Sequence, residues 1–222
     1  MDSSSHDNMS FLEHLEELRW HIIRSLIAII SAGFICFLMK DFIFDTIIFG
    51  PKKMDFPTYK FLCQAATFIG VETTFCGDEF PFIVQNRTMA GQFSAHVMTS
   101  IISGFIISFP YILYEFWKFI SPGLLEKEKA KSRGFIFISS LLFFIGVLFG
   151  YYIISPLSIN FLGTYQVSSQ VLNEIDLGSF ISLVRSSAIA SGIIFELPII
   201  ICFLTKAGVV TPESLVKYRK YA

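Results

Sequence analysis

The ionisable residue with the most apolar surroundings in this sequence is Glu196, within the segment 194–198. A carboxyl group in a long apolar segment is costly, so it normally faces protein or a water-filled cavity rather than lipid. Pro198 lacks a backbone N–H and removes a hydrogen bond two residues later, which leaves polar backbone near the carboxyl group. The pattern predicts either a docking site for a partner helix that carries a polar residue, or a protonated carboxyl group that packs inside the protein.

Other carboxylates gather in two charged stretches that border apolar segments. The stretch 14–19 reads His-Leu-Glu-Glu-Leu-Arg and immediately precedes an apolar segment, whereas Glu126 and Glu128 follow the turn at Pro122-Gly123. An ionised carboxylate accepts two parallel hydrogen bonds from a guanidinium group, which distinguishes arginine from lysine by geometry as well as charge. Taken alone, each stretch is typical of a solvated helix end.

Several kinds of chemistry have no pattern to support them. The histidines are scattered, no glycine-rich phosphate loop follows a strand, and no nucleophile elbow is present. The formal net charge of −1 gives no general attraction to nucleic acid. We therefore expect neither an enzyme nor a bound metal or cofactor.

Cys63 and Cys76 lie together in one long polar and aromatic connection, residues 40–96. If that connection faces an oxidising compartment, the two cysteines can form a disulfide that closes a loop of roughly a dozen residues. The alternative is a pair of free thiols, and the sequence does not choose between them.

The elements that must position these residues are apolar helices. A spanning helix needs roughly 20 mostly apolar residues, and four segments meet that length: 20–39, 97–114, 134–162 and 186–205. We predict an all-α integral membrane protein, a polytopic helical bundle in a single membrane domain over residues 1–222. The prolines at 110, 156 and 198 are expected to kink three of the helices and give the bundle a concave shape.

The orientation follows from the placement of Lys and Arg. Basic residues cluster between the second and third segments and after the fourth, whereas the connection 163–178 contains neither type. The positive-inside rule then places the N-terminus in the cytoplasm and the long loop 40–96 on the outer side, since long loops cross the membrane largely regardless of their charge.

Five stretches follow one another along the chain: the entry motif 14–19, the run 114–128, and the segments 143–146, 195–198 and 208–213. Together they resemble the TatC family of twin-arginine translocases. The resemblance covers nearly the whole chain, and its motifs occur in the family's order. Family members resemble six-span proteins, so the resemblance also implies that a fifth and a sixth span are missing after residue 222.

The resemblance implies roles for particular residues. Glu17 and Glu128 match the two acidic positions that read the paired arginines of a signal peptide. Arg19, Phe119 and Pro122 match positions that shape this region, and Leu15 and Leu125 are expected to pack against the signal peptide. Glu196 matches an intramembrane glutamate at which partner helices of the TatA/TatB type dock, and Pro51 matches a proline of the first external loop.

The resemblance also implies the protein's role and surroundings. The expected protein is the receptor and core subunit that binds signal peptides of folded proteins at the cytoplasmic face for export driven by the proton gradient. Its partners would be TatA/TatB-type proteins, other copies of itself and the lipid bilayer, without nucleic acid. We expect the bacterial cytoplasmic (inner) membrane rather than the thylakoid. The alternative function is a proton-coupled small-solute transporter in which Glu196 titrates.

Overall fold

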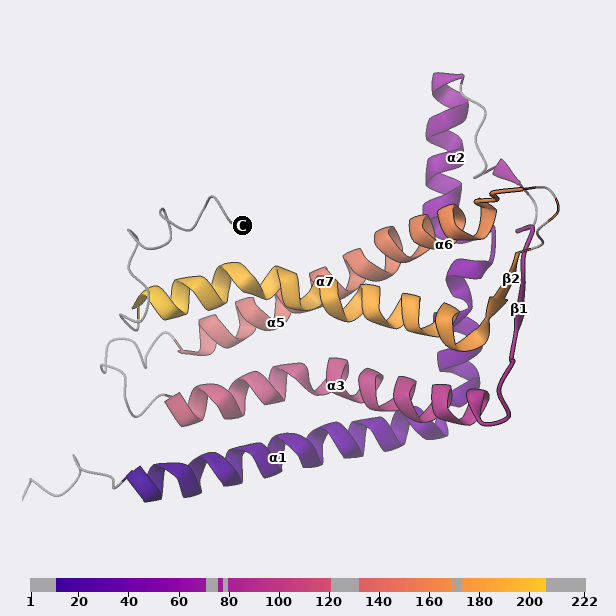
Figure 1. Cartoon of the computed structure of the whole chain (residues 1–222). Helices are drawn as coiled ribbons and strands as arrows, with labels where there is room; N and C mark the ends of the chain where they lie inside the picture. Colours follow the sequence, from indigo (N-terminus) through magenta and orange to yellow (C-terminus); the bar gives the residue numbers. More distant parts are fainter. Residues whose placement is uncertain are drawn as a thin grey trace, which may run out of the picture. The chain divides into compact units, whose positions relative to one another are not determined.

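The structure is a computed structural model that describes residues 11–70, 76–77, 80–120, 132–168, 170 and 173–206. Most of these residues are helical, and the helices are long (Figure 1). Among the described residues four helices are long and apolar enough to cross a membrane: Leu15–Leu38, Gly91–Ile120, Gly134–Thr164 and Leu177–Cys202. The predicted number of spans and the helical class are therefore confirmed.

The helices extend beyond the predicted spans. Helix α1 runs from Phe11 to Leu38, α3 from Gly91 to Ile120 and α7 from Leu177 to Lys206. The physical reason is that hydropathy marks only the part of a helix that suits lipid, whereas backbone hydrogen bonding continues through the more polar turns at each end.

The chain divides into two compact units, of which the first comprises residues 1–48 and 86–140. Its framework is an antiparallel pair of long helices, α1 and α3 (Figure 1). A π-helical segment, η1 (Phe42–Ile48), follows α1, and helix α5 (Ser132–Phe149) begins in this unit.

Small residues bring α1 and α3 together. Ser100, Gly104 and Ser108 recur every fourth residue, which places them on one face of α3. A Cβ atom built on Gly104 would lie 2.5 Å from the backbone nitrogen of Gly33, so the two backbones nearly touch. One turn further, Ser108 Oγ donates a 3.0 Å hydrogen bond to the carbonyl oxygen of Ala28. Close backbones and interhelical hydrogen bonds are the usual basis of helix association in lipid.

The second unit comprises residues 49–85 and 141–222. It contains the rest of α5, the π-helical segment η5 (Gly150–Ile154), α6 (Ser155–Thr164) and α7. A second seam of small residues joins α5 to α7, because a Cβ atom on Gly146 would lie 2.8 Å from the carbonyl oxygen of Ser191. This packing again needs a glycine at the point of closest approach.

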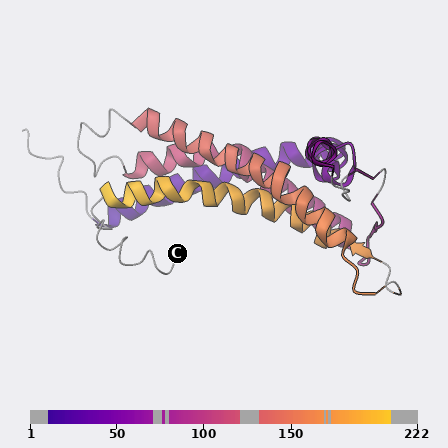
Figure 2. The same cartoon turned by 90° about the horizontal axis from the view of Figure 1, so that it is seen from above.

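The third span is longer than a bilayer requires, and it accommodates a proline near its outer end. Figures 1 and 2 show α5, η5 and α6 as one continuous helix. The π-helical turn ends just before Pro156, and the N–H of Ser155 bonds to the carbonyl oxygen of Gly150, five residues earlier. A π-bulge of this kind lets a proline follow without interrupting the helix.

The connection 40–96 is folded rather than open. Besides η1 it contains a short 3₁₀ turn, η2 (Gly50–Lys52), the helix α2 (Pro57–Ile69) and a three-residue strand, β1 (Ile83–Gln85). Strand β1 pairs in parallel with β2 (Glu174–Asp176), with Ile83 opposite Glu174. This small sheet is a minor addition to the predicted all-α fold, and it forms because two extended connections satisfy each other's backbone groups.

Candidate functional site

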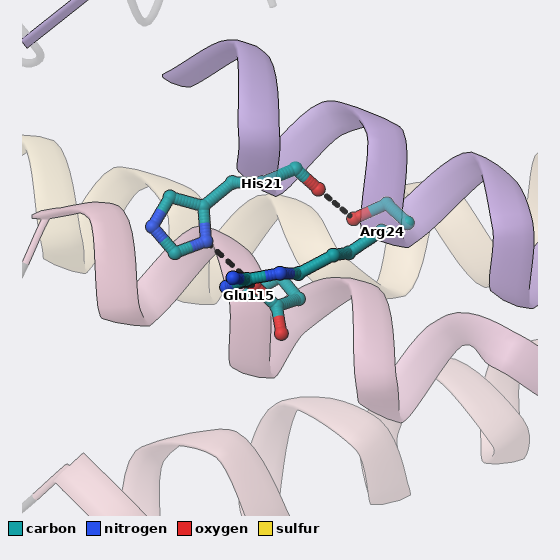
Figure 3. A network of polar contacts seen from close by, with 4 residues as sticks. His21, Arg24 and Glu115 are labelled. Carbon is teal, nitrogen blue, oxygen red and sulfur yellow. Dashed lines mark hydrogen bonds and ion pairs between the residues drawn. The ribbon is translucent and has the colours of Figure 1, made fainter. Parts of the chain in front are cut away.

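The α1–α3 pair contains a buried histidine–glutamate contact near the end where α1 begins and α3 finishes. His21 on α1 and Glu115 on α3 are 5% and 3% exposed. The Nδ1 atom of His21 lies 2.5 Å from Oε2 of Glu115 (Figure 3). Because a carboxylate only accepts hydrogen bonds, Nδ1 carries the proton and donates it. Two buried ionisable side chains, 94 residues apart in sequence, are therefore hydrogen-bonded to each other.

Arg24 completes this group, which we call the polar cluster: His21, Arg24 and Glu115. The Arg24 guanidinium lies 3.8 Å from the same Glu115 oxygen, and its side chain is 48% exposed (Figure 3). The ring of Phe119 meets the His21 ring edge-on, with centroids 6.1 Å apart. Glu115 thus contacts both His21 and Arg24 of α1.

Glu17 continues the same face of α1 toward the helix N-terminus. Glu17, His21, Arg24 and Ala28 are spaced by four, three and four residues, so they share the side that faces α3. Glu17 is half-buried. Its Oε2 atom is buried and accepts no hydrogen bond from the described part of the chain. An ionised carboxylate oxygen without donors is costly, and it has a strong tendency to accept a hydrogen bond from an incoming cation.

The structure separates the predicted signal-peptide residues into groups. The antiparallel register of α1 and α3 brings Glu17 to the level of Phe119, which is half-buried beside His21. Leu15 and Arg19 are exposed on the other side of α1, away from the face that meets α3. Pro122, Leu125 and Glu128 lie outside the described residues.

The remaining predicted residues belong to the second unit. Glu196 is 5% exposed within α7, as expected for a carboxyl group that avoids lipid. Pro51 is fully buried in η2, and its carbonyl oxygen lies 2.9 Å from the Tyr59 hydroxyl. Cys63 and Cys76 are joined by a disulfide, with Cα atoms 5.2 Å apart.

Sequence reasoning missed the polar cluster. His21 stands at the start of the first predicted span and Glu115 one residue beyond the second. Opposite charges at the same end of two consecutive spans were the available signal, because consecutive spans run antiparallel and bring those ends together. Taken singly, His21 is one of four scattered histidines and Glu115 falls within the run 114–128, so neither stands out.

The class of protein follows from these features. Within the described residues no group of three or more His, Cys, Asp or Glu side chains is placed to hold a metal ion. The chain is a polytopic helical membrane protein, and the described spans contain two buried carboxyl groups, those of Glu115 and Glu196.

Comparison with known proteins identifies the family. The family described as TatC, Sec-independent protein translocase protein, matches residues 13–222. The chain is 46% identical to the TatC of Blattabacterium sp. subsp. Periplaneta americana, over 97% of this chain and 82% of the relative. It is 35% identical to the TatC of Aquifex aeolicus, over 96% of this chain and 79% of that one.

Solved structures agree with the sequence relatives. A crystal structure of a twin-arginine translocase receptor, TatC, superposes with a TM-score of 0.70 at 32% identity, covering 94% of this chain and 82% of that one. A second, of the receptor in DDM, gives a TM-score of 0.72 at 34% identity and covers 94% and 83% of the two chains. The protein belongs to the TatC family. It is a protein-translocase component and not an enzyme.

Proposed function

We propose that this protein binds twin-arginine signal peptides at the cytoplasmic ends of α1 and α3, with Glu17 and Glu128 each receiving one guanidinium group. The observation that carries the proposal is the open hydrogen-bonding capacity of Glu17, whose Oε2 atom is buried and accepts no hydrogen bond from the described residues. The relatives named twin-arginine translocase receptors support the same reading.

The polar cluster is consistent with this role. His21 pairs with Glu115 on the side of α1 that faces α3, and Glu17 lies on the same side, level with Phe119. A guanidinium group from a signal peptide would then find a carboxylate on one side and an aromatic ring close by, both of which favour arginine over lysine.

A matched pair of variants tests the site. Glu17→Gln should weaken binding of a twin-arginine peptide by roughly 10- to 100-fold, the value of one or two charge-assisted hydrogen bonds. Glu16→Gln removes a charge from the neighbouring exposed residue and should leave binding nearly unchanged. Binding is measured on the reconstituted protein by photo-crosslinking.

Further comparisons make the result decisive. Crosslinks near Glu17 should be lost when both arginines of the peptide become lysines, and Glu128→Lys should abolish binding without affecting membrane insertion. If the Glu16 and Glu17 variants bind equally well, or if lysine replaces arginine without loss, the proposed recognition is wrong.

We further propose that Glu196 is the docking point for single-span partners of the TatA/TatB type. The support is the position of a carboxyl group inside an apolar span, where a polar residue of another helix can satisfy it. Glu196→Ala should then reduce co-purification of such partners while signal-peptide binding stays normal. Unchanged co-purification would favour the alternative, a carboxyl group that only packs inside this chain. The comparisons give no support to a small-solute transporter.

The setting of the protein completes the proposal. We infer that both units form one membrane domain over residues 1–222, that copies of the chain associate, and that the domain lies in a bacterial cytoplasmic membrane with the N-terminus inside. The distribution of Lys and Arg supports this orientation, and the bacterial origin of the named relatives supports a bacterial membrane. Labelling of single cysteines by a membrane-impermeant reagent should reach residues of α2 from outside and residues of the 121–131 connection only after permeabilisation.

A further inference from the structure

Helix α2 is 13 residues long, and its sides have different surroundings. One face packs inside the second unit through Tyr59 and Ala66. A second face carries Phe61, Phe68 and Ile69, which are 70%, 93% and 73% exposed. Large apolar side chains gathered with such exposure on one short helix mark a surface that meets something other than water.

Two hydrogen bonds fix how α2 is rotated about its axis. The hydroxyl of Tyr59 lies 2.9 Å from the carbonyl oxygen of Pro156. The preceding residue, Thr58, donates from its hydroxyl to the carbonyl oxygen of Tyr152. Tyr152 comes one turn before Pro156 in a span that ends at Thr164, so it lies about 6 Å deeper in the bilayer. The side of α2 that carries Thr58 therefore points toward the membrane interior.

The exposed apolar residues share that side. Counting from Thr58, the face continues at every third or fourth position with Phe61, Leu62, Ala65, Phe68 and Ile69. The opposite side carries polar residues, namely Lys60, Gln64 and Thr67. The helix is thus amphipathic, and its apolar side is the side that points toward the bilayer.

The direction of α2 also suits a membrane surface. Figure 1 shows α2 running across the direction of α6 and α7 within the same unit, and Figure 2 views it nearly along its own axis. Because α6 and α7 belong to spanning helices, a helix that crosses their direction lies along the plane of the membrane. At its anchored end it bonds to Tyr152, and Tyr152 and its neighbour Ile153 are 41% and 42% exposed on the third span.

We propose that α2 is an interfacial helix whose apolar side enters the headgroup region of the leaflet at that end of the spans. The occupant is lipid, because the apolar side of α2 continues the surface that the third span already presents to the bilayer. Helices with a polar side and a Phe-rich apolar side lie in this region with the apolar side buried by roughly 5–10 Å. The surface is separate from the residues proposed to read the signal peptide, and its role does not depend on them.

Tryptophan fluorescence of the full chain in phospholipid vesicles tests the proposal. Phe61→Trp and Ile69→Trp place probes on the apolar side, and Thr67→Trp places a matched probe on the polar side. All three positions are exposed, so a tryptophan fits without disturbing the core. The contribution of each probe is measured as the increment over the unsubstituted protein, whose own tryptophans are Trp20 and Trp117.

The expected result is blue-shifted emission from both apolar-side probes, with quenching by lipids brominated near the headgroup roughly twofold or more above that of Thr67→Trp. Equal quenching of all three probes would overturn the proposal, as would quenching of the apolar-side probes by aqueous iodide instead. Blue-shifted emission without quenching by brominated lipid would also overturn it, because a protein partner or a second copy of the chain would then cover the surface.

Discussion

Gly104 lies where α3 approaches α1 so closely that no larger residue fits without a shift of the backbone. A Cβ atom there would lie 2.5 Å from the nitrogen and 2.7 Å from the Cα of Gly33, and 2.6 Å from the carbonyl oxygen of Ile29. All three are backbone atoms of α1, so no side-chain rotation relieves the contact. Since carbon atoms pack at about 3.5–4.0 Å, Gly104→Ala must move the two helices apart by about 1 Å locally.

The effect of Gly104→Ala on the free energy of unfolding follows from two opposing contributions. Overpacking of this kind costs about 1–3 kcal/mol, whereas replacing glycine by alanine inside a helix returns up to about 1 kcal/mol. The 3.0 Å hydrogen bond from Ser108 to Ala28, one turn away, should also lengthen and weaken. We therefore expect Gly104→Ala to lower the free energy of unfolding by about 1–2 kcal/mol and to weaken signal-peptide binding, because Glu17 and Phe119 lie on the helices that separate.

Gly134→Ala is the matched control, since a Cβ atom at Gly134 would meet no atom within 4 Å. Unfolding of the purified full chain in detergent, followed by circular dichroism against denaturant, compares the two variants with the parent. Gly134→Ala should be as stable as the parent or slightly more so. If Gly104→Ala matches it, the close approach of the two backbones is not what holds α1 against α3, and the reasoning fails.

Three other measurements probe separate parts of the molecule. His21→Ala and Glu115→Ala should each lower the free energy of unfolding by roughly 3–5 kcal/mol, because each leaves the other buried side chain without its partner. In a double-mutant cycle the double variant should lose less stability than the sum of the two single losses, and additive losses would contradict the pairing. Reduction should expose two newly alkylated thiols, those of Cys63 and Cys76; no increase would reject the disulfide. Tyr59→Phe should cost about 1–3 kcal/mol, since buried carbonyl oxygens lose their donor. Burial raises the pKa of Tyr59, so the neutral phenol contributes stability below about pH 10 that is lost as pH rises toward the raised value; the Phe variant should lack this alkaline dependence.

The membrane-spanning helices could be predicted from the sequence because lipid imposes a local requirement. Each span must satisfy its own backbone hydrogen bonds and present apolar side chains over a fixed length, and both conditions are visible in consecutive residues. The same holds for the burial of Glu196, since an ionisable group in such a segment has few environments open to it.

The pairing of His21 with Glu115 and the face on which Glu17 lies could not be read in the same way. Both depend on how α1 is rotated against α3, and that rotation is set by Gly33, Gly104 and the hydrogen bond at Ser108. Hydropathy indicates only the ends of the two helices, so the predicted role of Glu17 rests on the family resemblance and not on a predicted face of α1.

The sequence by itself therefore determined the four spans, the helical class and the charged stretches that border them, because these are properties of neighbouring residues. Only the tertiary structure decided which polar groups face one another and which side of α2 lies against the third span. Contacts between residues nearly a hundred positions apart depend on helix register and rotation, and small residues at the points of closest approach set both.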